Sequence, residues 1–298
     1  RGQGFSLQSL TSATSADIIV SYDADWSNPV ANAPYTYDFF SETLRSRRSF
    51  NQEFRVLSNP LDYSTDKTFA WVVGAYYLDL NERNAITDLG TYINPFSSWP
   101  PYIKNVTGTR NYSSENSALF GTFDYLLSET LTVSFGLRWE DWEANYDDTF
   151  GERFNPSDQM LGGKLSLMKE WSNDTNLYAS IGRGYKAGGF NLGTGFTNQL
   201  YTDSLIYDPE YLWNYELGIN RQFPNSNTRV DAVIFYSDRK DQQVMASTQM
   251  DPNDPNTFTF LTQNAASGEN YGFELSLQSK PTDSLRVFAS LGLLQTEV

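Results

Sequence analysis

The sequence of 298 residues predicts an all-β fold, a transmembrane antiparallel β-barrel. Three observations carry this prediction. Apolar and polar residues alternate with a period of two in many segments, several segments reach ten residues or more, and short turns alternate with long linkers. Strands of soluble sheets are usually about half that long. Length and alternation together therefore favour strands that cross a membrane.

Segment 131–140 displays the alternation most clearly. Its odd positions carry Leu131, Val133, Phe135, Leu137 and Trp139, whereas its even positions are small, hydroxylated or charged. Because successive side chains of a strand point to opposite faces, one face is wholly apolar and the other is polar. In a barrel, the apolar face meets lipid and the polar face lines a wet lumen.

The same pattern predicts about eleven strands in chain order. They are expected at residues 17–26, 50–57, 68–80, 117–126, 131–140, 161–171, 176–185, 213–220, 229–237, 271–278 and 285–293. Phe5 to Gln8 fits the tail of a further strand, and no segment has a convincing helical period. In hydrocarbon every backbone N–H and C=O needs an internal partner, so a β chain there must close into a barrel.

The connections predict the orientation of the strands. Short polar turns are expected at 128–130, 172–175, 224–227 and 281–284, and long linkers at 27–49, 81–116, 141–160, 186–210 and 239–263. Outer-membrane barrels have short periplasmic turns and long extracellular loops. A strand of about eleven residues that is tilted by about 40° rises roughly 27 Å, which is enough to cross the apolar belt.

The composition excludes several classes of function. The chain has no Cys and no His, which removes thiol nucleophiles, disulfides, Cys/His zinc sites and His-based acid–base chemistry. A net charge of -15 disfavours nucleic acid as a partner. No catalytic motif is recognisable, so we expect neither an enzyme nor a bound cofactor.

Acidic residues gather in two of the expected linkers. They are Asp141, Glu143, Asp147 and Asp148 in one, and Asp251 and Asp254 in the other. Oxygen ligands of this kind suit Ca²⁺, but neither linker has the spacing of a calcium-binding loop. Solvated charge is therefore the expected role.

Several stretches resemble the barrel of TonB-dependent outer-membrane receptors of the iron-complex type. They are 50–58 (FNQEFRVLS), 71–77 (WVVGAYY), 176–191 (NLYASIGRGYKAGGFN), 209–218 (PEYLWNYELG), 235–241 (FYSDRKD) and 264–275 (NAASGENYGFEL). The resemblance spans about residues 16 to 294, and the order of the motifs makes the set specific.

The resemblance implies active uptake of a scarce nutrient, a ferric siderophore or a similar iron complex, across the bacterial outer membrane. It also implies an N-terminal plug, energy from the TonB complex and a barrel of about 22 strands. We expect residues 1–298 to be a single barrel portion of about 11–12 strands, without the plug and terminal strands. Two alternatives stay open: a passive porin, and a soluble β-rich carbohydrate-binding module.

Three sets of residues are candidates for functional roles. Aromatic residues near strand ends suit the headgroup region: Trp26, Trp71, Trp139, Trp213 and Tyr236. Charged residues on polar faces are expected to line the lumen, as paired wall residues or as contacts of a plug or substrate: Arg138, Glu140, Arg183, Glu216, Asp231, Glu274 and Arg286. Aromatic residues in long linkers are expected to form an outer vestibule for the substrate: Tyr92, Phe96, Trp99, Tyr102, Phe196 and Tyr201.

Overall fold

The computed structural model describes residues 4–25, 28–61, 68–192, 205–251, 254–264 and 267–297. Its main sheet contains, in spatial order, β1 (Phe5–Asp23), β2 (Thr36–Ser58), β3 (Phe69–Ile93), β4 (Tyr102–Ser128), β5 (Leu131–Asp148), β7 (Ser157–Ser172), β8 (Thr175–Lys186), β11 (Glu210–Phe223), β12 (Thr228–Lys240), β15 (Gly268–Thr282) and β16 (Leu285–Glu297). β6 (Arg153–Phe154) pairs with β5. Each predicted strand overlaps one of these strands, and neighbouring strands are antiparallel, so the fold-class prediction is confirmed.

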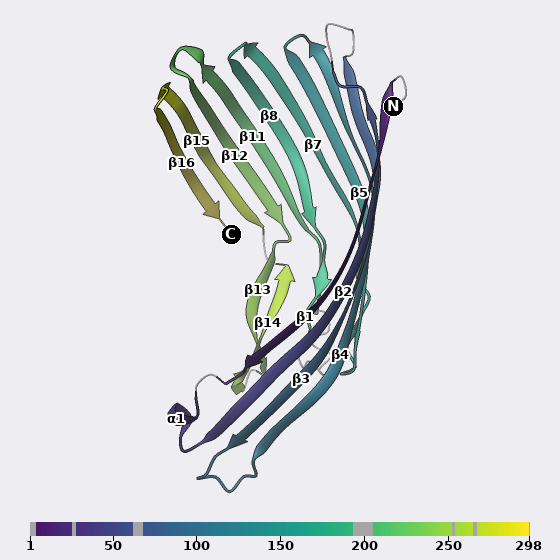
Figure 1. The fold of residues 1–298 in the computed structure, drawn as a ribbon, viewed down its shortest axis with the longest axis vertical. Helices are drawn as coiled ribbons and strands as arrows, with labels where there is room; N and C mark the ends of the chain where they lie inside the picture. Colours follow the sequence, from purple (N-terminus) through teal and green to yellow (C-terminus); the bar gives the residue numbers. More distant parts are fainter. Residues whose placement is uncertain are drawn as a thin grey trace.

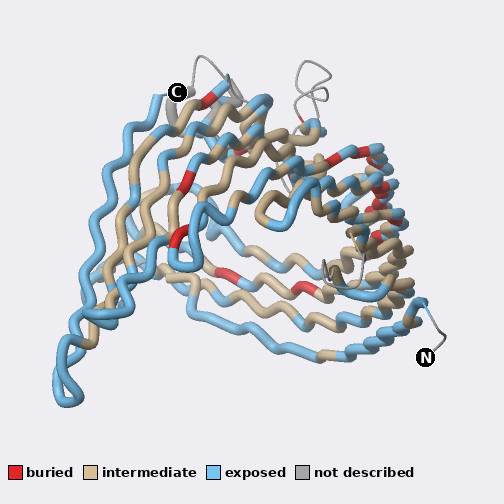
Figure 2. The backbone as a smooth tube through the Cα atoms, turned by 90° about the horizontal axis from the view of Figure 1, so that it is seen from above, coloured by how far each residue is buried: buried red, intermediate tan, exposed pale blue. Residues whose placement is uncertain are grey.

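The main sheet curves around an interior, as part of a barrel wall (Figure 2). Within the described residues, β1 and β16 are its two ends, and each pairs with a neighbour on one side only. The short turns lie at the top of Figure 1, whereas α1 (Pro29–Asn32) and the hairpin of β13 (Gln243–Asp251) and β14 (Asp254–Asn264) lie at the bottom. None of the described residues belongs to a helix with the length and apolar character needed to cross a membrane.

The register separates an apolar outer face from an inner face. One row of the outer face runs from Phe54 through Ala75, Leu119 and Trp139 to Leu161, because these residues pair directly across five strands. The neighbouring inner row includes Arg55, Gly74, Phe120, Arg138 and Gly162. Paired residues of an antiparallel ladder share a face. The two faces therefore differ in polarity over the whole width of these strands.

No second protein layer covers the outer face within the described part of the chain. Leu119 is 60% exposed and Leu167 is 44% exposed, although both are large apolar side chains in the middle of the sheet. On β7 the outer face extends from Leu161 to Trp171, which corresponds to a rise of roughly 25 Å for a tilted strand. An apolar face of this height matches the hydrocarbon belt of an outer membrane, and we call it the lipid belt.

Several predicted linkers are wrong over most of their length. Residues 36–49, 81–93 and 102–116 belong to β2, β3 and β4, so the strands continue beyond the lipid belt. β3 has 25 residues and β4 has 27, and their hairpin stands well outside the belt. The segments 5–8 and 17–23 are parts of one strand, β1.

The alternation changes phase where the lipid belt ends. On β5 the outer face changes from Trp139 to Asp141, while the inner face changes from Glu140 to the buried Trp142. Outside the hydrocarbon the outer face meets water, so it becomes acidic. The inner face becomes apolar because connecting segments pack against it, as described below.

β1 follows the same inversion, and one prediction fails there. Ile18 lies opposite Arg45, which in turn lies opposite Asn84, so this row belongs to the inner face. The apolar side of 17–26 was expected to meet lipid. It is instead on the inner face of a strand segment that lies beyond the belt.

The predicted acidic linker at 141–148 is also strand. Glu143 lies directly opposite Glu115, and Glu115 lies opposite Asp79, so three carboxylates form a row on the outer face. Among the residues that the structure describes, no group of three or more Asp or Glu side chains is arranged to hold a metal ion. Asp251 ends β13 and Asp254 begins β14.

Candidate functional site

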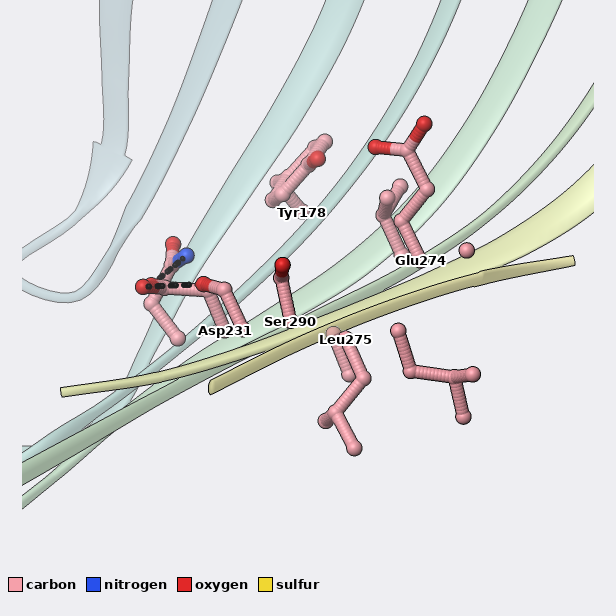
Figure 3. A pocket seen from close by; sticks show the side chains of 11 residues that line it. Tyr178, Asp231, Glu274, Leu275 and Ser290 are labelled. Atoms are coloured by element: carbon pink, nitrogen blue, oxygen red, sulfur yellow. Dashed lines mark hydrogen bonds between the residues drawn. The ribbon is translucent and has the colours of Figure 1, made fainter. Parts of the chain in front are cut away.

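The inner wall of β8, β11, β12 and β15 is polar and acidic. Tyr178, Asp231, Glu274 and Ser290 project to one side of the sheet, and Leu275 projects to the other (Figure 3). These polar side chains line a depression with a volume of about 350 Å³. Asp231 accepts hydrogen bonds from Asn220 Nδ2 at 2.7 Å and from Arg229 Nε at 3.0 Å. The wall therefore holds the Asp231 carboxylate in a hydrogen-bonded position on the concave side.

Most of the predicted lumen residues share this inner face. The register gives the inner face to Arg138, Glu140, Glu216, Asp231 and Glu274, and Arg286 alternates along β16 with Val287 of the outer face. Arg183 is the exception, and its prediction is wrong. It lies opposite Trp213 and opposite Gly163, which is paired with Leu137, so it belongs to the outer face.

A polar network joins side chains of β4, β5 and β8 across the intervening β7 at the outer edge of the lipid belt. Glu140 accepts hydrogen bonds from Asn116 Nδ2 at 2.5 Å, from Arg138 Nε at 2.8 Å and from the Tyr185 hydroxyl at 2.8 Å. Strict alternation would give Tyr185 the same face as Arg183, two residues earlier. The β7–β8 ladder ends at the pair of Gly163 and Arg183, and beyond it Tyr185 turns inward over Gly162 of β7, where an added Cβ would be 2.8 Å from the tyrosine ring. We call these residues the Glu140 network; it joins β4, β5 and β8 on the inner face.

An aromatic cluster lies just outside the Glu140 network, on the same inner face. Phe190 of β9 (Gly189–Phe190) is its centre, with ring centroids at 5.3 Å from Tyr146, 5.1 Å from Phe154 and 6.1 Å from Tyr112. Its floor is the buried core of Trp142, Ala144 and Met160. The Trp142 indole N–H donates to Ser114 Oγ at 2.8 Å. We call this set the rim cluster.

Burial alters the acidity of the rim cluster. The hydroxyl of Tyr146 donates to Asp148 Oδ2 at 2.9 Å. Desolvation, followed by this hydrogen bond, raises the pKa of Tyr146 well above its ordinary value. The phenol therefore stays neutral, and the cluster offers apolar ring faces together with hydroxyl groups.

Three amide side chains connect the rim cluster to the long connections on its outer side. Asn191 donates to Thr262 O at 2.8 Å and accepts from Thr262 N at 2.7 Å, which joins the β8–β11 connection to β14. Asn264 donates to Asp208 O and Asp241 O, at 2.9 and 2.7 Å. Gln243 donates to Ala187 O at 2.8 Å. These contacts, the loop clamp, hold the β13–β14 hairpin beside the rim cluster.

The predicted vestibule aromatics lie elsewhere, at the tip of the β3–β4 hairpin. Tyr92 and Tyr102 are paired across the two strands, and the loop between them exposes 76% of Phe96 and 81% of Trp99. Tyr102 and Tyr112 of the rim cluster are separated by roughly 33 Å of β4. Phe196 and Tyr201 lie outside the described residues. Within the described residues, the tip and the rim cluster are therefore separate aromatic surfaces.

An ion pair braces the long hairpin below its tip, and it predicts a pH dependence. Asp88 accepts hydrogen bonds from Ser41 Oγ at 2.7 Å and from Lys104 Nζ at 3.0 Å. Partial burial favours the protonated acid, but these hydrogen bonds outweigh it and lower the pKa of Asp88 below its ordinary value of 3.8. A lowered folded-state pKa gives stability that is present above the ordinary value and lost as the pH falls through the folded value. The protection factors for amide hydrogen exchange in 84–92 and 102–110 should therefore fall below about pH 4.

The Asp88→Asn variant is the control for this pH dependence. It removes the titrating carboxyl but retains an oxygen that accepts a hydrogen bond from Ser41. The protection factors in this variant are expected to be lower at neutral pH and insensitive to acid. An unchanged acid response in the variant would assign the effect to another group.

The predicted interface aromatics lie on the outer face where they are described. Trp71 is at the short-turn end of β3, in the same row as Phe123. Trp139, Trp213 and Tyr236 lie toward the opposite end of the belt. Trp26 lies outside the described residues. The roles of these rings at the headgroups stay predictions.

The residues that the sequence analysis missed are those of the rim cluster. Trp142, Ala144 and Tyr146 were expected in a linker, yet they keep the period of two that begins at Leu131. The available signal was the continuing alternation with inverted polarity. Phe190 carries no such signal, since β9 has two residues and its place depends on the loop clamp.

Long antiparallel strands, a lipid-facing outer side and a polar inner side that carries charges and aromatics define a membrane β-barrel protein. The chain belongs to the family of TonB-dependent receptors: residues 2–296 match the family described as "TonB dependent receptor-like, beta-barrel". This agrees with the motifs at 50–58, 176–191 and 209–218.

Individual relatives agree with this family. The chain is 23% identical over 186 residues to the pesticin receptor of Yersinia enterocolitica, covering 60% of this chain and 25% of that protein. It is 24% identical over 214 residues to the "Probable TonB-dependent siderophore receptor PiuA" of Acinetobacter baumannii, covering 70% and 26%. The chain thus spans about a quarter of the length of these relatives.

Solved structures share the fold. The ferric yersiniabactin uptake receptor FyuA from Yersinia pestis aligns with a TM-score of 0.70 at 16% identity, covering 100% of this chain and 41% of that chain. The copper transporter OprC aligns with a TM-score of 0.60 at 13% identity, covering 88% and 43%. At such identities the likeness concerns the fold alone.

Proposed function

We propose that this chain is part of the barrel wall of an outer-membrane receptor that takes up a ferric siderophore or a similar iron complex, with energy from TonB. The observation that carries the proposal is the position of the rim cluster. It lies on the inner face directly outside the lipid belt, on the outer side of the charged Glu140 network. A substrate that enters from outside would meet aromatic rings first and charged wall residues next.

The relatives support the substrate class. One is described as a siderophore receptor and another as a ferric yersiniabactin uptake receptor. The fold alone does not select the cargo, because OprC, which shares it, is described as a copper transporter. We therefore base the proposal of an iron chelate on the family relatives. We assign capture to the exposed tip aromatics Phe96 and Trp99, with Tyr92 and Tyr102. Phe196 and Tyr201, which lie outside the described residues, stay candidates for the same role.

The remaining parts of the receptor are proposed to lie outside this chain. A plug that contacts TonB and the strands that complete the barrel belong to the full-length polypeptide, in keeping with the quarter of the relatives' length that is matched. Arg138, Glu140, Glu216, Asp231, Glu274 and Arg286 would then face the plug or the substrate route. The outer face would contact outer-membrane lipid.

Uptake by cells tests this proposal. Iron-starved Gram-negative cells that express the full-length protein are given radioactive ferric hydroxamate, catecholate and mixed-ligand chelates, with and without a functional tonB gene. Uptake of at least one chelate should require both the protein and TonB. Passage that is independent of TonB would favour a passive porin, and a freely soluble protein would favour the carbohydrate-binding alternative.

A double variant tests capture at the tip. Phe96→Ala with Trp99→Ala should weaken chelate binding by about thirtyfold, since each of the two aromatic contacts contributes about 1 kcal/mol. Val30→Ala is the matched control, because Val30 is an equally exposed apolar residue of another outer connection. Equal binding by the double variant and the control would exclude the tip as the capture surface.

A further inference from the structure

Arg183 is a cation on the apolar face of the sheet. The outer face of β8 otherwise carries Leu177, Ala179 and Ile181, in register with Ile219, Leu217 and Tyr215 of β11. Arg183 continues this row, opposite Trp213. A charge at the middle of the belt would be costly, whereas near the interface the cost falls to about 0–1 kcal/mol. Its depth and its contacts therefore decide what it can do.

The contacts of Arg183 direct its guanidinium toward the outer interface. Arg183 Nη1 donates to Leu161 O at 2.5 Å, and Leu161 lies opposite Trp139 at the outer end of the belt. That carbonyl is available because the β7–β8 ladder ends at the pair of Gly163 and Arg183. The side chain thus extends from its own row to the level of the interfacial tryptophan.

The aromatic ring of Tyr211 fixes the orientation of the Arg183 guanidinium. Arg183 Cζ lies 4.0 Å from the centroid of Tyr211, a cation–π contact that is favourable beside lipid. Tyr211 is paired with Lys240, whose Nζ is 3.1 Å from Asp238 Oδ1, so Asp238 already neutralises the neighbouring cation. One N–H of Arg183 is used by Leu161, and an arginine carries five such donors in a rigid fork.

The chemistry of this position selects an anion of the membrane itself. A planar, pre-oriented guanidinium binds phosphate through paired N–H donors, and its rigid plane lowers the entropy lost on binding. Farther along the same outer face, Glu143 and Glu115 lie directly opposite each other and repel anions. Beyond Trp213 the row of Arg183 continues with Asp238, which is balanced by Lys240, and then with Glu269. A phosphate at the interface would therefore favour the β8–β11 side over both the β4–β5 side and the β12–β15 side.

We propose that Arg183, stacked on Tyr211 and flanked by Trp213, binds the phosphate of a lipid headgroup in the outer leaflet. The tryptophan and tyrosine rings would contact the glycerol or sugar portion and the upper acyl chains, as aromatic belt residues do. This site faces lipid, so it is distinct from the inner face on which the proposed uptake depends.

Native mass spectrometry of the full-length protein in detergent tests the site. The probes are lipid A with two phosphates, the same lipid after phosphatase treatment, and inorganic phosphate. The wild type should retain the phosphorylated lipid about tenfold more strongly than the dephosphorylated lipid. Arg183→Gln should lose this preference, and Arg183→Lys should keep part of it because a point charge replaces the fork.

Two comparisons keep the test decisive. Arg229→Gln removes an arginine from the inner face and should leave lipid binding unchanged. Heat-modifiable gel mobility establishes that each variant is folded before its lipid binding is compared. The proposal is overturned if wild-type protein does not distinguish the two lipids, if Arg183→Gln binds like wild type, or if millimolar inorganic phosphate displaces the lipid completely.

Discussion

Replacement of Leu167 by arginine is expected to lower the free energy of unfolding in a bilayer by about 2–4 kcal/mol. Leu167 is on the outer face of β7, between the two ends of the lipid belt, and it lies opposite Val133 and Ala179. An arginine there must place its charge in hydrocarbon or distort the bilayer to reach water. Urea titration of the full-length protein folded into vesicles measures the difference.

The next residue along β7 is the matched control. Met168 is 44% exposed, the same fraction as Leu167, and it lies on the inner face opposite Tyr178. Met168→Arg should change the free energy of unfolding by less than about 1 kcal/mol, because the inner face of a barrel is hydrated. Equal losses in the two variants would mean that protein covers both faces, and the assignment of lipid to the outer face would be wrong.

The sequence predicts the membrane-spanning part of the strands, because there the lipid requires apolar and polar residues to alternate. Within 131–140, hydrocarbon on one side and water on the other require strict alternation, and the segment has it. Outside the belt no solvent imposes that rule. Trp142 and Tyr146 are then buried by connecting segments whose positions a local pattern does not encode. This explains why 141–148 was interpreted as a linker.

Arg183 illustrates a second limit. A charged residue on a strand is expected on the wet face, and the rule holds for Arg138 and Glu216. It fails at Arg183 because a long side chain can leave the apolar belt, donate to Leu161 O and stack on Tyr211. These partners are on other strands, and only the register brings them together.

The family motifs acquire a physical explanation in the loop clamp. Asn191 and Asn264 belong to the motifs 176–191 and 264–275, and both use their amides to join separate connections through backbone groups. Glu210, in the motif 209–218, accepts a hydrogen bond from Gln243 N at 2.8 Å. The resemblance identified the family from these residues, whereas their structural task became visible only when the connections were placed side by side.

Replacement of Glu140 by alanine is expected to lower the free energy of unfolding by roughly 2–3 kcal/mol. It would leave three donors, on Asn116, Arg138 and Tyr185, without their acceptor on the inner face. Hydrogen bonds to a charged group contribute about 1.5–3 kcal/mol, and the partial exposure of Arg138 keeps the total near that range. Urea titration in vesicles measures the loss.

Glu143, three residues farther along β5, tests whether the loss comes from the network or from any missing carboxylate. It is on the outer face directly opposite Glu115, where like charges repel. Glu143→Ala should therefore leave the free energy of unfolding unchanged or raise it by up to about 0.5 kcal/mol. If both alanine variants were equally destabilised, the loss would be one of strand propensity. If Glu140→Ala alone were destabilised, the Glu140 network would be the joint that fixes β8 against β5 beneath the rim cluster, and the geometry of the rim cluster would depend on it.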